Sequence, residues 1–228
     1  MARVVKKANE RKEEILAISQ HLFFQKGYDS TSVNDIIKAA GISKGAFYHH
    51  FASKDELMAG LVNQFRDGLI AQLSVVADSS QSALEKLNQI FQMTQSEKLK
   101  NIDTLELSFK VLYSDDNLKM RTRIIDSNFE VALPLVSKVV EQGINNGEFV
   151  TDAPDAAAEF ILVLGMHMGN QVAKFILRQS DGQDPAAVLY DKVDHFERNV
   201  EKMLSLPKGA FVAIDKGTLK KLVARIQK

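Results

Sequence analysis

Residues Gly41–Phe51, G-I-S-K-G-A-F-Y-H-H-F, decide how this chain is interpreted. On a helical wheel of about 100° per residue, Phe47 and Phe51 fall together, whereas Gly45 and His49 point the opposite way. Side chains that are small or carry hydrogen-bond donors flank the outer pair: Lys44, Ala46 and Tyr48. A short helix with such a face can enter the DNA major groove, which admits a helix but few large side chains. The alternative is a polar surface helix with incidental histidines, and the neighbouring segments distinguish the two.

Two further helices are predicted before this stretch. Apolar residues at helical spacing predict a helix over about 7–26, which Gly27 ends. Ser32 begins a capping-box pattern, so a short amphipathic helix starts there and ends at Gly41. Ser43 then caps the helix of the opening stretch. Two short helices joined by a tight glycine turn are typical of a helix-turn-helix.

The remainder of the chain is also predicted to be helical, because no run with the alternation of a β-strand has useful length. Ser53, with Glu56 three residues later, begins a long helix that would connect the N-terminal part to the rest. Further helices are predicted between clusters of breaker and cap residues, at about 82–98, 101–113, 117–146, 155–179, 185–205 and 217–227. The expected fold is all-α, with a helix-turn-helix domain and its basic tail at 1–52 and a larger helical domain at 53–228.

Composition excludes several classes of protein. Of 228 residues, 45% are hydrophobic and 25% are charged, which is ordinary for a soluble globular chain. The lack of cysteine excludes disulfides and thiolate metal sites, and no apolar run approaches the roughly 20 residues of a transmembrane helix. The basic N-terminus lacks the apolar run of a secretory signal. We therefore expect a cytoplasmic protein without a metal or other cofactor.

Charge is distributed unevenly, although the net charge is +0. Residues 1–55 carry nine Lys or Arg and six Asp or Glu, whereas the remainder carries 20 Lys or Arg and 23 Asp or Glu. A basic end on a mildly acidic body would let that end approach phosphates. A solvated basic tail explains the same residues equally well.

The segment Thr31–Leu57, T-S-V-N-D-I-I-K-A-A-G-I-S-K-G-A-F-Y-H-H-F-A-S-K-D-E-L, resembles the DNA-binding part of the TetR family of bacterial transcriptional regulators. The glycine turn, the S-K-G cap, the Tyr-His-His-Phe run and the S-K-D-E-L helix start occur in order. With the F-x-x-K-G-Y-D turn before it, the resemblance covers about residues 10–62. Phe47 departs from the family, which more often has a smaller aliphatic residue there, but a phenylalanine should still fill the core.

The resemblance implies which residues contact DNA. Phosphates would be met around the two short helices by Thr31, Ser32, Tyr48 and Lys54. The residues nearest the base edges would be Lys44, Gly45, Ala46 and His49. His50 lies nearer the buried side, and for it both a packing role and a phosphate contact stay open. Phosphate contacts position a protein and base contacts specify sequence, so replacing Lys54 should weaken binding to all DNA, and replacing His49 should change operator preference.

Two helices predicted in the second half of the chain point to a homodimer. The helix at about 155–179 has hardly any polar face between Phe160 and Met168, which indicates burial on several sides. The helix at about 185–205 carries a narrow apolar seam, formed by Leu189, Val193, Phe196, Val200 and Met203. Such a pair suits a two-fold four-helix interface, and the resemblance likewise implies a homodimer on a near-palindromic double-stranded DNA operator. The alternative is that both helices complete the core of a single chain.

A ligand pocket is predicted beside Pro134, which should kink the long helix that contains it. Candidate lining residues come from that helix, from the two before it and from the segment flanked by Gly165 and Gly169: Met93, Leu105, Phe109, Phe129, Leu133, Met166 and His167. Each of them could equally be plain core, and a lone histidine among apolar neighbours is more often a hydrogen-bonded core residue.

The leading interpretation is a ligand-responsive DNA-binding repressor that a small apolar or amphipathic molecule releases from its operator. The helix that begins at Ser53 would transmit the shift. The alternatives are a constitutive DNA-binding protein without an effector and a helical enzyme, although the sequence has no Walker loop, G-x-S-x-G or H-E-x-x-H motif. The basic helix within 217–228 is expected to dock on the body, with membrane or nucleic-acid binding as its alternative.

Overall fold

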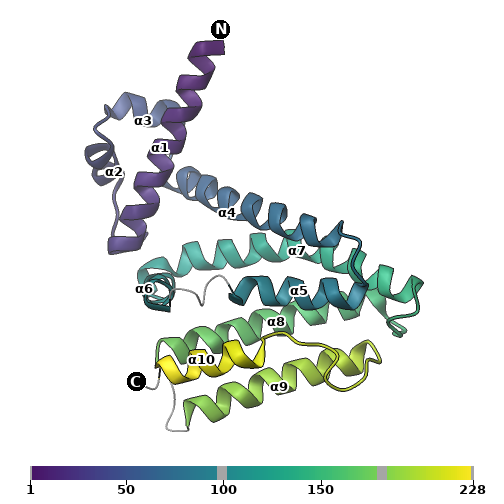
Figure 1. The fold of residues 1–228 in the computed structure, drawn as a ribbon. Coiled ribbons are helices and arrows are strands. Elements are labelled where there is room, and N and C mark those ends of the chain that lie inside the picture. Colours follow the sequence, from purple (N-terminus) through teal and green to yellow (C-terminus); the bar gives the residue numbers. More distant parts are fainter. Residues whose placement is uncertain (1, 97–101, 179–183, 227–228) are drawn as a thin grey trace. The chain divides into compact units, whose positions relative to one another are not determined.

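The computed structural model describes residues 2–96, 102–178 and 184–226, and all regular secondary structure within these ranges is helical (Figure 1). These residues fall into two compact units. The head unit comprises Met1–Gly68 and Lys110–Asn128, and the body unit comprises Leu69–Phe109 and Phe129–Lys228. Because α4, α6 and α7 each cross a boundary, three helices contribute residues to both units.

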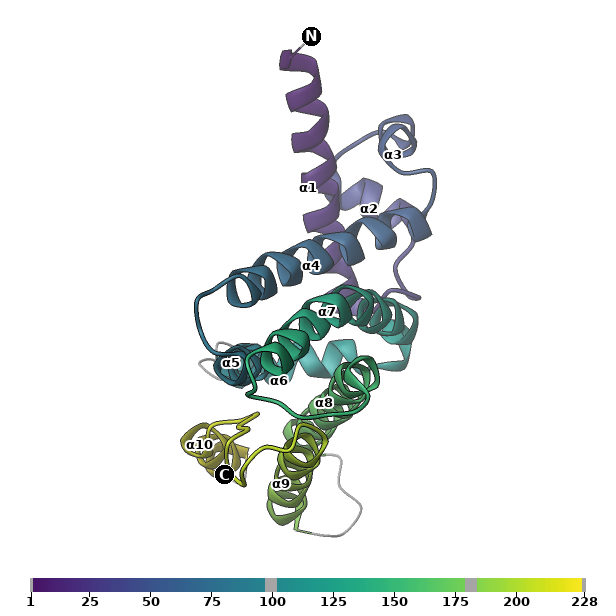
Figure 2. The ribbon, with the colours of Figure 1, turned by 90° about the vertical axis from the view of Figure 1, so that its right-hand side faces the viewer.

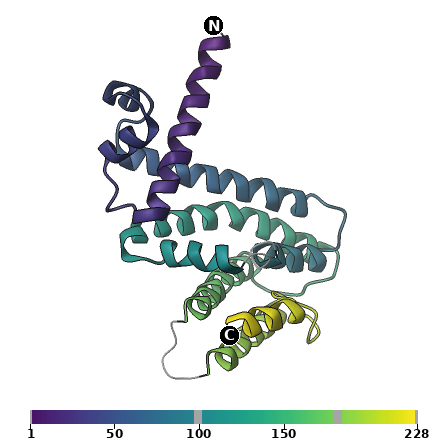
Figure 3. The same cartoon turned by 60° about the vertical axis from the view of Figure 1, so that its left-hand side comes forward.

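The head unit begins with α1 (Ala2–Lys26), α2 (Val33–Ala40) and α3 (Lys44–His50), which lie together in Figures 1 and 3. The first part of α4 (Lys54–Ala77) follows. The end of α6 (Ile102–Leu112), the short 3-10 helix η2 (Asp115–Asn117) and the first part of α7 (Leu118–Asn145) complete the unit. The large buried side chains of its core are Phe23, Phe47, Phe51, Leu57, Met58 and Met120. Phe47 therefore fills the core, as predicted.

The body unit contains α5 (Ala83–Ser96), α8 (Pro154–Ile176), α9 (Pro185–Met203) and α10 (Lys216–Ile226), with the remaining parts of α4, α6 and α7. Its core is one cluster that draws on α4, α5, α7, α8, α9 and α10. In Figures 1 and 2 α10 lies beside α9. The apolar stripe of α10, which consists of Leu219, Leu222 and Val223, is buried, whereas Lys220 and Lys221 are exposed. The prediction that this helix docks on the body is confirmed.

The predicted helices agree with the observed ones apart from details at their ends. The main difference is α1, which begins at Ala2 rather than near Lys7. The added residues are mostly Ala, Arg, Lys and Val, and no breaker precedes Gly27, so the helix continues back into the basic tail.

The apolar seam of α9 is used inside the chain. Leu189, Val193, Phe196 and Val200 are buried in the body core, and α9 packs on α8. These side chains are therefore unavailable to a partner, and the predicted homodimer through the two helices stays a prediction that would need other residues of their surfaces. The outer surface of the two helices instead exposes other apolar residues: Phe160 at 56%, Val163 at 47% and Tyr190 at 41%.

Within the described ranges, no helix combines the length and the apolar character needed to cross a membrane.

Candidate nucleic-acid interface

The two short helices are fixed by local hydrogen bonds that the sequence predicts. The Ser32 side chain accepts from Asp35 N at 3.1 Å, and Ser32 N donates to Asp35 Oδ2 at 2.8 Å, which completes a capping box at the start of α2. Gly41 ends α2 with φ +61°, in the left-handed region that glycine adopts freely. Ser43 Oγ then accepts from Ala46 N at 3.1 Å and caps α3. The glycine turn between two capped helices therefore has one defined geometry.

Ser32 is exposed, but its hydroxyl is already engaged. It donates to Asp35 Oδ2 at 2.6 Å, and that carboxylate also pairs with Lys26 Nζ at 2.9 Å. The bonds from Ser32 and Lys26 hold the pKa of Asp35 well below its usual range. The Ser32 side chain thus stabilises the start of α2, and a phosphate that approached this point would also meet the Lys26 cation.

The outer face of α3 is open. Lys44, Gly45, Tyr48 and His49 are exposed and Ala46 is half-buried, while Phe47 on the opposite face is fully buried. A Cβ built on Gly45 would have Ser43 Oγ, 3.9 Å away, as its nearest neighbour. Lys44 Nζ lies 6.0 Å from the centre of the Tyr48 ring, so the cation and the ring sit together on this face. The predicted base-reading side of α3 is therefore free of side chains that would block a groove.

The two histidines at the end of α3 differ in exposure. His49 is exposed and His50 is half-buried, and their rings meet edge to face with centroids 5.1 Å apart. Burial lowers the pKa of His50, and the nearby positive charges of His49, Lys12 and Arg11 lower it further. His50 is thus biased toward its neutral form.

Thr31 is a correction to the predicted set of phosphate contacts. Its side chain is fully buried, and its hydroxyl donates to Gly27 O at 2.6 Å. A buried and satisfied hydroxyl cannot reach a phosphate. Thr31 instead ties together the two ends of the turn between α1 and α2.

Lys54, the other lysine predicted to meet DNA, is bound to the same turn. Its ammonium donates to Tyr28 O at 2.8 Å, Thr31 O at 2.9 Å and Asp29 O at 3.5 Å, and it lies 4.2 Å from the centre of the Tyr28 ring. An ammonium has three donors, and all three are directed at this turn. Lys54 therefore holds the turn before α2 in place, and we propose that its side chain positions the helix-turn-helix rather than contacting a phosphate.

A network of ion pairs continues from this turn into α7. Asp55 Oδ1 accepts from Tyr28 Oη at 3.1 Å and from Lys119 Nζ at 2.6 Å, and Arg123 Nη2 lies 3.6 Å away. Burial and the hydrogen bond to Asp55 raise the pKa of Tyr28 to about 12. The bonds from Lys119 and Tyr28 lower the pKa of Asp55. Both shifts favour the phenol as donor and the carboxylate as acceptor.

Asn117 is the residue of this unit that sequence reasoning missed. It is 0% exposed, and its side chain accepts from Tyr28 N at 2.8 Å and donates to Phe23 O at 3.2 Å and Val111 O at 3.0 Å. A buried asparagine with two main-chain partners in a distant segment, Tyr28 and Phe23, connects η2 to the end of α1. The one signal in the sequence is its position after the Ser-Asp-Asp turn, which does not reveal those partners.

Asp116 makes a second connection between η2 and the same turn. Its carbonyl oxygen accepts from Asp29 N at 3.0 Å, and its carboxylate accepts from Ser30 Oγ at 3.2 Å. Gly27, with φ +88°, permits this approach because a Cβ there would lie 2.4 Å from Asp116 Cβ. The segment 114–117 is therefore built into the head unit.

The predicted ligand-lining residues lie in the body unit in different environments. Met93, Phe109, Phe129 and Leu133 are partly buried against the body core, and Met166 is half-buried. The side chain of Leu105 lies outside the described residues. His167 is exposed on α8, where its Nε2 lies 3.2 Å from Gln171 Nε2, so its assignment to an internal pocket is wrong. The helical register from Phe160 and Val163 places His167 on the outer face of α8.

Comparison with known proteins supports the interpretation of the head unit. Residues 15–61 match the family described as bacterial regulatory proteins, tetR family. The chain is 32% identical over 156 residues to the HTH-type transcriptional repressor KstR2 of Mycobacterium tuberculosis (strain CDC 1551 / Oshkosh), an alignment that spans 67% of this chain and 76% of that protein.

Solved structures show the same fold at lower sequence identity. A TetR-family transcriptional regulator from Pectobacterium atrosepticum superposes with a TM-score of 0.63 at 22% identity and covers 89% of this chain and 98% of its own. SmeT in complex with triclosan superposes with a TM-score of 0.62 at 19% identity and covers 89% of this chain and 95% of its own. The all-helical fold predicted from the sequence is thus confirmed.

Proposed function

This chain belongs to the TetR family of bacterial transcriptional regulators, and on that premise we propose that it is a repressor that binds operator DNA through α2 and α3 and is released by a small apolar or amphipathic molecule. The observation that carries the DNA-binding part is the open outer face of α3. That face combines an unobstructed glycine with exposed Lys44, Tyr48 and His49, and Phe47 anchors the opposite face in the core. Such a helix can approach base edges closely and offer them donors.

The test of the groove assignment is Gly45→Arg. Open space surrounds Gly45, so the free protein accommodates the new side chain, whereas a bulky residue would block close approach to DNA. Gly68→Arg is a matched control, because Gly68 lies in the same unit and a Cβ at its position would have no heavy atom within 4 Å.

Wild-type protein would first be used to select bound fragments from genomic DNA, and one selected duplex would then be titrated with each variant. We expect Gly45→Arg to lose at least about tenfold in affinity, equivalent to about 1.4 kcal/mol, with an unchanged melting temperature. Gly68→Arg should bind as the wild type does. Equal affinity of the two variants would contradict the assignment of α3 to the groove.

An effector acts, in this proposal, by binding the body more tightly in a conformation that does not fit the operator. A ligand shifts such an equilibrium only by the difference between its affinities for the two conformations. To change their population ratio from 1:99 to 99:1, it must bind the favoured conformation roughly 10⁴-fold more tightly than the other. The relative SmeT, solved with triclosan, supports an apolar ligand class for this chain. The partly buried residues Met93, Phe109, Phe129 and Leu133 remain the proposed lining.

Ligand-dependent melting separates this sensor from a constitutive DNA-binding protein. A molecule that binds only the folded body at 100 times its dissociation constant stabilises the protein by about 2.7 kcal/mol and raises its melting temperature. An effector should also lower operator affinity at that concentration. A library of apolar and amphipathic compounds in which no member does both would favour the constitutive alternative.

A homodimer is part of the proposal because two heads are needed to read a near-palindromic operator. Its proposed interface is the outer surface of α8 and α9. Exposed Phe160, Val163 and Tyr190 belong to these two helices and support this placement, since exposed large apolar side chains are common at interaction sites.

A further inference from the structure

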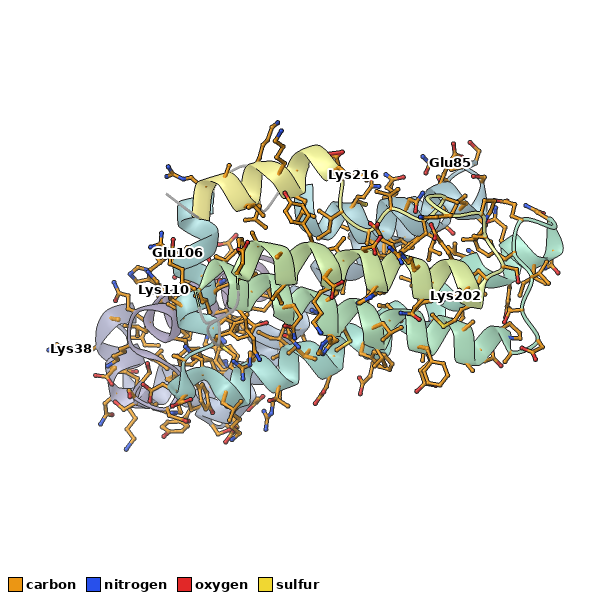
Figure 4. All side chains as sticks on the ribbon, turned by 90° about the horizontal axis from the view of Figure 1, so that it is seen from below. Lys38, Glu85, Glu106, Lys110, Lys202 and Lys216 are labelled. Carbon is orange, nitrogen blue, oxygen red and sulfur yellow. The ribbon has the colours of Figure 1, made fainter. Side chains whose placement is uncertain are left out.

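The segment between α9 and α10 is held along its main chain by side chains of two helices. We call residues 207–215 the strap. Phe211, Ala213 and Ile214 of the strap are buried, whereas Lys208 and Gly209 near its start are exposed. Figure 4 labels Lys202 near the end of α9 and Lys216 at the start of α10, between which the strap runs.

Two amide side chains of α5 bind one edge of the strap. Asn88 Nδ2 donates to Ala210 O at 3.1 Å, and Asn88 Oδ1 accepts from Val212 N at 2.9 Å. One amide thus binds the strap in both directions, as a neighbouring β-strand would. Gln92 Nε2, one helical turn further on, donates to Val212 O at 2.9 Å.

Two carboxylates of α9 bind the other edge. Glu201 Oε1 accepts from Gly209 N at 2.5 Å and from Phe211 N at 3.4 Å. Glu197 Oε1 accepts from Ala213 N at 2.9 Å and from Ile214 N at 3.5 Å. All the partners that these side chains of α5 and α9 find in the strap are main-chain atoms, so these hydrogen bonds do not depend on the side chains of the strap.

One side chain of the strap enters a slot lined by aromatic rings. The ring of Phe211 is 0% exposed and packs edge to face on Phe91 of α5 and Phe196 of α9, with centroids 5.5 and 5.6 Å apart. Phe91 and Phe196 are themselves 5.4 Å apart. Gly165 of α8 makes room for this slot, because a Cβ there would lie 2.4 Å from Phe91 Cε1. The slot therefore accepts a flat aromatic group.

The two carboxylates that bind the strap are largely removed from water. Glu201 is 6% exposed, and burial raises the pKa of Glu197, with further contributions from the negative charges of Glu201 and Asp194. Desolvation of the two carboxylates offsets much of what their hydrogen bonds gain. Phe211 and the apolar stripe of α10 add buried apolar surface to these hydrogen bonds.

We propose that the strap and α10 form one unit that can detach from the rest of the body. Phe211 of this unit fills the slot between Phe91 and Phe196 as a bound peptide would, and a small apolar aromatic ligand can fill the same slot. Opening of this unit exposes the slot between Phe91 and Phe196 while the rest of the body core, which includes the buried seam of α9, stays folded. An aromatic ligand competes with Phe211 for the slot and so favours the open form. This inference concerns the body unit alone and does not depend on DNA binding.

Hydrogen exchange of the full-length protein, followed by mass spectrometry, tests whether the unit detaches. We expect the amides of the strap and α10 to exchange through a local opening, at least about tenfold faster than those of the buried part of α8. Asn88→Ala removes two hydrogen bonds to the strap and should accelerate strap and α10 exchange by a further tenfold or more, without changing α8. Asn199→Ala is the matched control, since Asn199 is exposed on α9 and bonds to His195 O.

Toluene, as a probe, tests the ligand class of the slot. In the wild type, near-saturating toluene should accelerate exchange of the strap, because the probe displaces Phe211. In Phe211→Ala, which leaves a ring-sized apolar space, toluene should raise the melting temperature by more than in the wild type, where its binding must also displace Phe211. If Phe211→Ala does not fold, the wild-type exchange experiment decides alone. The proposal is overturned if the strap and α8 exchange at one common rate, if Asn88→Ala accelerates both equally, or if toluene leaves strap exchange unchanged.

Discussion

Lys54 illustrates what a single cation contributes to the geometry of the head unit. Its ammonium group joins the start of α4 to three carbonyl groups of the turn before α2. A hydrogen bond from a charged donor is worth about 1.5–3 kcal/mol, and less where water screens it, as at this half-buried position. The orientation of α2 therefore depends on a residue that lies outside the helix-turn-helix.

We expect Lys54→Met to lower the free energy of unfolding by about 1–2 kcal/mol. Operator affinity should fall as well, but the slope of log affinity against log salt concentration should stay the same. A phosphate contact would instead reduce that slope by about 1. Lys38→Met, which changes an exposed lysine of α2, should leave the stability within about 0.5 kcal/mol. If Lys54→Met instead reduces the slope of log affinity against log salt concentration, Lys54 contacts a phosphate.

His50 should make the stability of the head unit depend on pH. Its pKa is lowered in the folded chain, so the unfolded chain takes up the proton first as the pH falls below about 6.5. Stability is therefore lost from about pH 7 downward until the folded form is also protonated. In His50→Gln this part of the loss should vanish, whereas His21→Gln, at an exposed position of α1, should retain it. Urea unfolding midpoints at pH 7 and pH 5 measure the difference, and equal pH dependence in the two variants would refute the role of His50.

At the scale of the helices, the outer surface of α8 is where assembly should be most sensitive to charge. Phe160→Glu places a carboxylate in the proposed interface and should shift the protein from dimer to monomer in sedimentation at micromolar concentration. Val75→Glu, at another exposed apolar residue of the body unit, should leave the dimer intact. If the Phe160→Glu variant remains a dimer, the interface does not lie on this surface of α8.

Helix bounds set by neighbouring residues can be predicted from the sequence, whereas the packing partners of a helix cannot. The bounds of α2 and α3 follow from Ser32, Gly41 and Ser43, whose effects are confined to a few residues, and the structure confirms them. The seam of α9 indicates a packing surface, but periodicity does not say whether that surface meets its own chain or another. Asn117 and Tyr28 are 89 residues apart, and no local sequence pattern predicts the hydrogen bond between them.

At the scale of the whole chain, the units do not follow the order of the sequence. The predicted boundary between residues 52 and 53 stays a prediction about function, while the compact head unit also includes residues 110–128. Any signal that reaches this unit can therefore arrive through α6 and α7 as well as through α4. The expectation that the helix after Ser53 transmits the shift stays a prediction, and α6 and α7 are further candidates.

A fragment of residues 1–68 should consequently fail to unfold cooperatively on its own. It lacks Met120, which is 1% exposed in the core of the unit, and it lacks the partner that Asn117 provides to the turn at Tyr28. The same fragment joined through a flexible Gly/Ser linker to residues 110–128 should show a cooperative thermal transition by circular dichroism. A cooperative transition in the shorter fragment would mean that residues 110–128 are dispensable.

The close approach of Gly27 to Asp116 has a consequence for genetics. In cells selected for escape from repression, we expect alleles at Gly27 to arise beside alleles at Gly45, although we propose contact with DNA only for Gly45. Immunoblots should distinguish the two groups. Alleles at Gly45 would accumulate to normal levels, whereas any side chain at Gly27 would strain a left-handed turn, collide with Asp116 and leave the polypeptide open to proteolysis. Substitutions at position 27 would thus relieve repression by lowering the amount of regulator in the cell.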